Sequence, residues 1–326
     1  MRLTTALGTV ADRIPVPAQP SVLRGRQFPF AAPNTPAGVE PVDPTRKSGA
    51  DYDTDWARTF PARVARVVLL EAALRPAVAG LARPTRSGLD RLTDLRDAER
   101  DTDGSIQPVI FCANHHSHVD TPLVLTSIPE PWRHQVFVGA AADYFFRTQV
   151  TGAAASLVLN AIPIERSTVT RRSADQAAEL IADGWSMLIF PEGGRSPDGW
   201  GQDFRGGAAY LARRTGAPVV PIHLAGTGRI LRKGSKKVRP SPTVVTFGSP
   251  IRAEDGEDTR RLGTRIERAV AALADEHVTD WYQARTRAHA AGTPDLTGPD
   301  APSWRRAWAL GDRGPRRRRR STWPER

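Results

Sequence analysis

The residues of this chain that are best suited to proton transfer stand together in FCANHHSHVD, residues 111–120. This run holds His115, His116 and His118, three of the seven histidines in the protein, and ends on Asp120. An unperturbed imidazole titrates near ~6.5 and can therefore act as a general base at neutral pH. Solvated loops rarely concentrate imidazoles in this way, so the run predicts a functional site with general-base chemistry.

A second polar segment also follows directly on an apolar run. The sequence SMLIF at 186–190 leads into PEGGRS at 191–196, where two adjacent glycines would let backbone N–H groups approach an anion closely. The Arg195 guanidinium can bind a phosphate with two parallel hydrogen bonds. A plain turn is the alternative interpretation, because Pro, Gly and Asp favour turns. If the two apolar runs are neighbouring strands, four side chains converge: His115, Asp120, Glu192 and Arg195.

Strand-like and helix-like segments alternate from about residue 106, which predicts an α/β fold with a mostly parallel central sheet and helices packed on it. Open sheets of this kind bind ligands beyond the carboxyl ends of their strands. The expected strands lie within 106–114, 134–141, 159–166, 186–193, 218–226 and 242–251. The expected helices are 173–184, 207–216 and 258–282. Ser173 and Gln176 form a capping-box pattern, and Gly184 and Gly216 are expected to end the first two helices.

The pattern divides the chain into four parts. Residues 1–58 are rich in proline and are expected to be disordered, and 59–95 form an amphipathic helical segment before the catalytic domain at 96–283. Residues 284–326 are a linker and an arginine-rich tail. Within the helical segment, 61–82 has an apolar face rimmed by arginines, and Pro76 should kink it. That face either covers the core of its own domain or lies in a membrane interface.

Charge is concentrated at the carboxyl end of the chain, whose formal net charge is +11 over 326 residues. Residues 301–326 contain nine arginines against Asp312 and Glu325, together with three tryptophans. Arginine with tryptophan suits an anionic membrane surface, although nucleic acid would attract the same tail and a solvated end would also tolerate it. We see no signal peptide and no run of 18 apolar residues, so no spanning helix is predicted. One cysteine, Cys112, excludes an intrachain disulfide.

Four ordered blocks resemble the glycerolipid acyltransferases, and most closely the 1-acylglycerol-3-phosphate acyltransferases. Asn114, His115, Ser117 and Asp120 are similar to the NHxSxxD signature of that family. The remaining blocks are IPIER at 162–166, FPEGGRS at 190–196 and VPI at 220–222. In the third block Gly194 replaces the usual threonine. Residues 204–207, FRGG, resemble a Phe-Lys-x-Gly element with arginine at 205. The resemblance covers roughly 61–280, so both tails lie outside it.

This resemblance implies transfer of a fatty acyl group from acyl-CoA or acyl carrier protein to the hydroxyl of lysophosphatidic acid, giving phosphatidic acid. His115 would be the general base and Asp120 would orient it. The positions expected to bind substrate are Arg166, Glu192, Gly193, Gly194, Arg195 and Arg205. No cofactor is implied beyond the acyl-CoA or acyl-ACP co-substrate. The expected partners are the lysophospholipid acceptor, the donor and an anionic membrane surface, with no specific nucleic acid, at a cytoplasmic and peripherally membrane-bound location. Glycerol-3-phosphate or another lysophospholipid is the alternative acceptor.

Other interpretations of the same residues stay open. His116, His118 and Asp120 have the His-x-His-x-Asp spacing of a zinc metallo-hydrolase, although threonine at 121 departs from that pattern. Cys112 could be a nucleophile, but its apolar surroundings favour an inert buried thiol. Ser117 lacks the glycine pattern of a nucleophile elbow. In a non-enzymatic alternative, the arginine tail is the functional element and the folded domain is an adaptor for nucleic acid or membrane.

Overall fold

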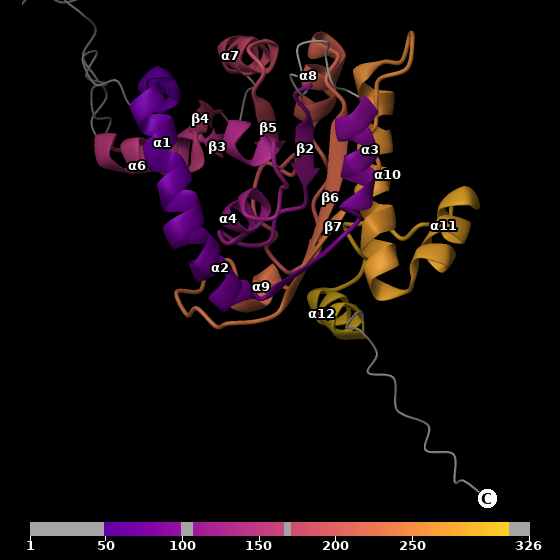
Figure 1. Cartoon of the computed structure of the whole chain (residues 1–326). Coiled ribbons are helices and arrows are strands. Elements are labelled where there is room, and N and C mark those ends of the chain that lie inside the picture. Colours follow the sequence, from indigo (N-terminus) through magenta and orange to yellow (C-terminus); the bar gives the residue numbers. More distant parts are fainter. Residues whose placement is uncertain (1–48, 99–106, 166–170, 313–326) are drawn as a thin grey trace, which may run out of the picture. The chain divides into compact units, whose positions relative to one another are not determined.

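The structure, a computed structural model, describes residues 49–98, 107–165 and 171–312. Its centre is a seven-stranded sheet in the order β1-β7-β6-β2-β5-β3-β4 (Figure 1). Strands β2 to β6 run parallel to one another, whereas β7 is antiparallel to β6 and β1 is parallel to β7. The strands are β1 Pro84–Ser87, β2 Ile110–Ala113, β3 Val136–Ala141, β4 Ala161–Ile164, β5 Ser186–Ile189, β6 Val219–Ala225 and β7 Thr243–Phe247. The predicted α/β fold with a mostly parallel sheet is confirmed.

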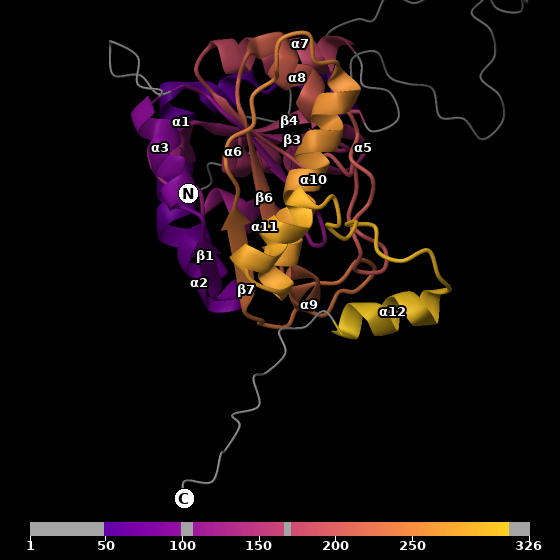
Figure 2. The same ribbon diagram turned by 90° about the vertical axis from the view of Figure 1, so that its right-hand side faces the viewer.

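Helices cover both faces of the sheet, and Figure 2 shows α1, α2 and α3 on one side of it and α10 and α11 on the other. The helices before the fourth strand are α1 Phe60–Val68, α2 Arg75–Ala82, α3 Asp90–Ala98, α4 Asp120–Leu125, α5 Ala142–Phe145 and α6 Gln149–Leu159. Those after it are α7 Arg171–Ala182, α8 Gly207–Thr215, α9 Thr227–Ile230, α10 Thr259–Val278, α11 Trp281–His289 and α12 Ser303–Asp312. Among the described helices, none has the length and apolar character to cross a membrane.

Strand β2 lies at the centre of the sheet and explains why the polar loops meet. All four of its residues are buried, and they alternate between two apolar cores. Phe111 packs into the core that contains residues of α2 and α4, whereas Ile110 packs into the core formed with α7, α8 and α10. In the sheet, β2 pairs with β5 in parallel, with Cys112 opposite Ile189. Parallel neighbours end at the same edge, so the loops that follow them emerge side by side.

The predicted amphipathic helix is one helical run with an irregular centre. A π-helical turn, η4 Leu69–Leu74, joins α1 to α2, and the Arg75 N–H bonds to the Leu70 carbonyl. Pro76 lacks a donor and its ring crowds the preceding turn, which is the physical reason for this local widening. The predicted apolar face divides along its length. Leu70 and Val78 are buried in the core, but Val64 and Val68 are 47% and 58% exposed.

Buried Arg66 accounts for the exposed valines in the first part of this run. Its guanidinium donates to the carbonyls of Ala57 and Leu157, and the latter N–O distance is 2.9 Å. Burial and neighbouring arginines lower the pKa of Arg66 to about 10, so the group remains charged. The residue thus ties α1 to the turn before it and to α6, and turns the neighbouring valines outward.

Three boundaries differ from the sequence prediction. The folded part begins before residue 58 with the 3-10 turns η2 Gly49–Asp51 and η3 Asp55–Arg58. Buried Tyr52, between these turns, packs against the Phe146 ring at a tilt of 47°. The helical segment 59–95 is interrupted by β1, a short strand with a polar sequence at the edge of the sheet. The predicted linker contains α11 and α12. Residues 1–48 and the tail 313–326 lie outside the described residues.

Helix ends were predicted with mixed success. Gly184, two residues after the end of α7, and Gly216, directly after α8, adopt positive φ values of 87° and 73°, as predicted. The capping box at Ser173 is wrong, because α7 already begins at Arg171 and Ser173 lies within the helix. A third 3-10 turn, η5 Trp132–Gln135, precedes β3.

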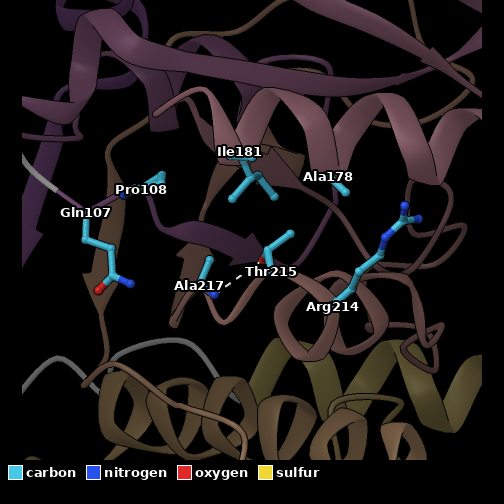
Figure 3. A pocket seen from close by; sticks show the side chains of 8 residues that line it. Gln107, Pro108, Ala178, Ile181, Arg214, Thr215 and Ala217 are labelled. Carbon is cyan, nitrogen blue, oxygen red and sulfur yellow. Dashed lines mark hydrogen bonds between the residues drawn. The ribbon is translucent and has the colours of Figure 1, made fainter.

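A pocket of about 430 Å³ lies where β2 and β6 begin (Figure 3), whereas the polar loops follow the ends of β2 and β5. Pro108 and Ala217, which precede β2 and β6, line it together with residues from the ends of α7 and α8. The Ala217 N–H donates to Thr215 Oγ1 at 3.3 Å and closes the turn between α8 and β6. Because this pocket lies before the strands, it is separate from the loops described below.

Candidate active site

The loop between β2 and α4 folds around the carboxylate of Asp120. Asp120 Oδ2 lies 2.9 Å from His115 Nδ1, and it also accepts the backbone N–H groups of His116 at 2.6 Å and Ser117 at 2.7 Å. The carboxyl is fully buried, whereas the His115 side chain is 18% exposed. A carboxylate that only accepts places the proton of the imidazole on Nδ1. The second ring nitrogen, Nε2, is then the basic one.

Both backbone polar groups of His115 bind the loop that follows β5. Its N–H donates to Glu192 Oε1 at 2.9 Å, and its carbonyl accepts the Ser196 N–H at 2.8 Å. The imidazole also stacks on the Phe190 ring, with centroids 4.3 Å apart and planes 23° apart. The ring is therefore fixed by hydrogen bonding on one side and by aromatic packing on the other. The predicted approach of the two loops is confirmed, with His115, Asp120 and Glu192 directly connected.

Glu192 is a buried residue that joins two loops. One carboxyl oxygen accepts from His115, and the other, Oε2, accepts the Gln202 N–H at 3.1 Å. Burial raises the pKa of Glu192 to about 8, although its backbone hydrogen bonds lower it in part. Since both oxygens are occupied by the protein, Glu192 positions the loops in this structure. Its predicted binding of the acceptor stays a prediction.

The buried carboxyl of Glu192 predicts a pH-dependent stability. Between the ordinary value of 4.5 and about 8, the folded protein retains a proton that the unfolded chain has lost. The free energy of unfolding should therefore fall as pH rises through this window, with a contribution of at most ~1.4 kcal/mol per pH unit. Glu192→Gln cannot lose a proton and should show a shallower dependence. Urea unfolding of both proteins across this window measures the difference, and equal slopes would contradict the prediction.

Two adjacent glycines after Glu192 have different surroundings. Gly193 has a φ of +70°, and a Cβ atom there would lie 2.8 Å from Arg205 Nε. Arg205 therefore lies against this turn, and its own N–H donates to the Pro191 carbonyl at 2.9 Å. Gly194 has no atom within 4 Å of such a Cβ, and its carbonyl accepts from the Gln202 side chain at 2.9 Å. Only the first position requires glycine.

Alanine at these two positions should give opposite results. Gly193→Ala forces a side chain into left-handed backbone and against Arg205, so we expect the free energy of unfolding to fall by about 1–2 kcal/mol. Gly194→Ala is the matched control and should change it by less than about 0.5 kcal/mol. Thermal and urea unfolding of the pair check this. Equal destabilisation of the two variants would show that the turn does not depend on the left-handed residue.

Of the other arginines predicted to bind substrate, Arg195 lies within the described residues and Arg166 does not. Arg195 is half-buried and stands directly before Ser196, whose N–H binds the His115 carbonyl. Its own carbonyl accepts from Lys233 Nζ at 2.9 Å, which brings a further cation to this loop. Arg166 lies outside the described residues. The strand before it, β4, is the edge strand and is separated from β5 by β3.

Further residues of the motif loops, together with Tyr144 and Gln202, which sequence reasoning missed, also build the site. Asn114 exchanges two hydrogen bonds with the Leu224 backbone, at 3.0 and 2.7 Å, and so fastens the end of β2 to β6. Ser117 Oγ donates to the Leu231 carbonyl at 2.9 Å, which leaves it a structural residue. The His118 ring stacks on Tyr144, which lies beyond β3. No motif connects Tyr144 or Gln202 to the site, whereas Phe190 stands within the quoted FPEGGRS block.

The alternative chemistries are not favoured by this geometry. Within the described residues, the one group of three metal-ligating side chains with ligand atoms within 4.8 Å is Glu71, Glu130 and His134, so His116, His118 and Asp120 do not converge as zinc ligands. Burial, with a smaller effect of Glu192, raises the pKa of the Cys112 thiol far above its ordinary range. A buried protonated thiol is a poor nucleophile, as the sequence suggested.

The region that contains these loops is similar to known proteins. Residues 91–225 match the Acyltransferase family model, a span that includes both loops of the site. A 1-acyl-sn-glycerol-3-phosphate acyltransferase of Cocos nucifera is 30% identical over 164 residues, which are 46% of this chain and 48% of that protein. The chloroplastic BAT2 1-acyl-sn-glycerol-3-phosphate acyltransferase of Brassica napus is 34% identical over 149 residues, 45% of this chain and 41% of its own length. The match thus spans about half the length of these relatives.

A solved structure is also similar. The 1-acyl-sn-glycerophosphate acyltransferase PlsC of Thermotoga maritima aligns with a TM-score of 0.49 and 22% identity, over 69% of this chain and 83% of that one. The family model and the named relatives agree with the signature residues that the two loops bring together. Residues 91–225 of this protein therefore match the Acyltransferase family model, and the chain is similar in sequence to 1-acyl-sn-glycerol-3-phosphate acyltransferases.

Proposed function

We propose that this protein transfers a fatty acyl group from a thioester donor to the free hydroxyl of lysophosphatidic acid, forming phosphatidic acid. The proposal depends on the position of the His115 imidazole, which is hydrogen-bonded to Asp120 and stacked on Phe190. It lies directly beside the loop that contains Gly193, Gly194 and Arg195. A base next to an anion-binding loop suits an acceptor that has both a hydroxyl and a phosphate. The names of the relatives support the same reaction.

In the proposed reaction, His115 Nε2 removes the proton of the acceptor hydroxyl as its oxygen attacks the thioester carbonyl. The C–S bond of the tetrahedral intermediate then breaks, and the imidazolium returns the proton to the leaving thiolate. The Asp120 carboxylate stabilises the imidazolium through Nδ1, 2.9 Å away. The acceptor is itself the nucleophile, so no covalent acyl-enzyme is formed.

The acceptor phosphate is assigned to arginines of the second loop. Arg195 follows the two glycines, and Arg205 lies against Gly193, so both stand next to this turn. The Gly193 N–H already donates to the Phe190 carbonyl at 3.1 Å, so the guanidinium groups are the proposed phosphate ligands. Arg166 is retained as a third phosphate ligand from the sequence alone. Gly194 offers room for an acceptor where the family has threonine, because nothing lies within 4 Å of its missing Cβ.

Both acyl-bearing molecules are poorly soluble, so we also propose that the protein binds a membrane peripherally, with the cytoplasmic side predicted from the sequence. The exposed apolar residues of α1 support membrane contact, since Phe60 is 77% and Val68 58% exposed beside exposed Arg63. An apolar helix face flanked by arginines is typical of helices in a membrane interface.

The reaction is tested with purified full-length protein, labelled oleoyl-CoA and separate acceptors. We expect labelled phosphatidic acid from lysophosphatidic acid, and less product from glycerol-3-phosphate or lysophosphatidylcholine. Replacing the CoA thioester by acyl carrier protein identifies the donor. A protein that hydrolyses the donor equally with and without every acceptor is not an acyltransferase of this kind.

Arg195→Ala should weaken acceptor binding more than it slows the chemical step. Loss of a charge-assisted phosphate contact is worth about 1.5–3 kcal/mol, so we expect KM for lysophosphatidic acid to rise about 10- to 100-fold with a smaller change in kcat. Arg213→Ala, on the exposed side of α8, is the matched control. If KM is unchanged in Arg195→Ala, the phosphate must be bound elsewhere.

A further inference from the structure

Helix α12 lies outside the residues that match the family model, yet it is fastened to the loop that follows Arg195. The Trp200 indole donates to the Arg306 carbonyl at 3.0 Å, and Arg306 Nε donates to Asp198 Oδ2 at 2.7 Å. Gly199 approaches Leu310 so closely that a Cβ atom there would lie 2.5 Å from its Cδ2 atom. The helix is therefore a fixed neighbour of the site loop.

The opposite side of α12 exposes two large aromatic rings. Trp304 is 65% and Trp308 73% exposed, and the four-residue spacing places them on one side of the helix, away from Arg306. The guanidinium of Arg305 lies over the Trp304 ring, 5.1 Å from its centroid. The exposure of large apolar rings to water is unfavourable. Tryptophan beside arginine is typical of the headgroup region of a membrane.

A basic loop lies on another side of the same site. Between Gly226 and Pro242 the chain has six cations and no acidic residue, and all six are exposed: Arg229, Arg232, Lys233, Lys236, Lys237 and Arg239. The loop is tied to the site because the Leu231 carbonyl accepts from Ser117 and Lys233 donates to the Arg195 carbonyl. Figures 1 and 2 both show α9, the loop after it and α12 at the lower end of the molecule.

We propose that Trp304, Arg305 and Trp308 of α12, with the six cations of the 229–239 loop, form one basic–aromatic surface that binds an anionic lipid bilayer and holds the mouth of the site against it. This inference deepens the proposed function and rests on it for the source of the substrate. The cations attract the anionic headgroups, and the indoles enter the interface. Contact at this end brings a membrane-dissolved acceptor to His115 without its passage through water.

Charge alone would also suit nucleic acid, but the exposed aromatic rings favour lipid. The exposed face of α12 presents indole rings in a helix, whereas phosphate-backbone contacts depend on cations and need no such rings. Aromatic residues and cations together are the composition of an anionic membrane contact.

The test is sedimentation of the full-length protein with vesicles of phosphatidylcholine, alone or mixed with phosphatidylglycerol. Trp304→Ala/Trp308→Ala should weaken binding to the mixed vesicles by at least about tenfold. Lys236→Gln/Lys237→Gln should weaken it by about thirtyfold, since each cation contributes about 1 kcal/mol, and should leave binding to pure phosphatidylcholine unchanged. Neither pair contains a residue assigned to the reaction.

Trp281→Ala/Tyr282→Ala is the matched control, because these aromatic residues of α11 are 54% and 73% exposed and lie outside the proposed surface. It should bind vesicles as the wild type does. In detergent with dispersed acceptor, the α12 variant should keep wild-type turnover. Unchanged vesicle binding by the α12 variant, equal loss in the control, or loss only of binding to a DNA duplex would each overturn the proposal. Wild-type protein that binds vesicles through this surface but transfers no acyl group would instead refute the proposed reaction alone.

Discussion

His115→Ala should abolish acyl transfer while the protein remains folded. The imidazole is the base of the proposed reaction, and such a group contributes about 10²–10⁴-fold to the rate. Its removal leaves the backbone contacts of residue 115 with Glu192 and Ser196 intact, because they involve only the main chain. Turnover with labelled oleoyl-CoA, measured together with circular dichroism and the thermal midpoint, separates chemistry from folding.

His118→Ala is the control for this experiment. His118 belongs to the same loop, but its ring stacks on Tyr144 with centroids 5.3 Å apart, away from the Asp120 carboxylate that holds His115. We expect its turnover to remain within a few-fold of the wild type. Wild-type turnover in His115→Ala would overturn the assignment of the base, and a complete loss in His118→Ala would move the assignment along the loop.

Asp120→Asn should lower kcat by about 10²–10⁴-fold, by analogy with the carboxylate of hydrolase triads. An amide oxygen can still accept the backbone N–H groups of His116 and Ser117, so the loop should keep its shape. The lost charge no longer stabilises the imidazolium that forms when His115 takes a proton. The variant therefore separates the effect of the Asp120 charge on the reaction from the effect of its hydrogen bonds on the shape of the loop.

Asp120→Ala is the informative comparison for that variant. It removes the acceptor of three donors, His115 Nδ1 and two backbone N–H groups, from a fully buried position. Unsatisfied buried donors cost about 1–3 kcal/mol each, so this variant should lose stability as well as turnover. Measurements of kcat and of urea unfolding distinguish the two. If Asp120→Asn keeps more than about a tenth of wild-type kcat, the carboxylate charge is not needed for the reaction.

The sequence predicted those parts of the molecule in which the relevant residues are close along the chain. His115 and Asp120 are five positions apart, and a short loop is enough to bring their side chains together. The alternation of apolar runs with helical patterns likewise predicted the mostly parallel sheet, because buried strands and amphipathic helices have distinct periods. The C-terminal glycines of α7 and α8 were predicted for the same local reason, their positive φ.

The tertiary structure decided everything that depends on strand order. Glu192 meets His115 across 77 positions because β5 lies next to β2, and the local sequence at either place contains no sign of that pairing. Three other features also depend on contacts between distant segments: the burial of Arg66, the pairing of β1 with β7 and the attachment of α12 through Asp198. Periodicity reports which face of a segment is apolar, but contacts between distant segments depend on which segments the fold places side by side. The chain alone therefore predicted the proposed chemistry of the site, and only the folded sheet decided which residues hold His115 and its loop in position.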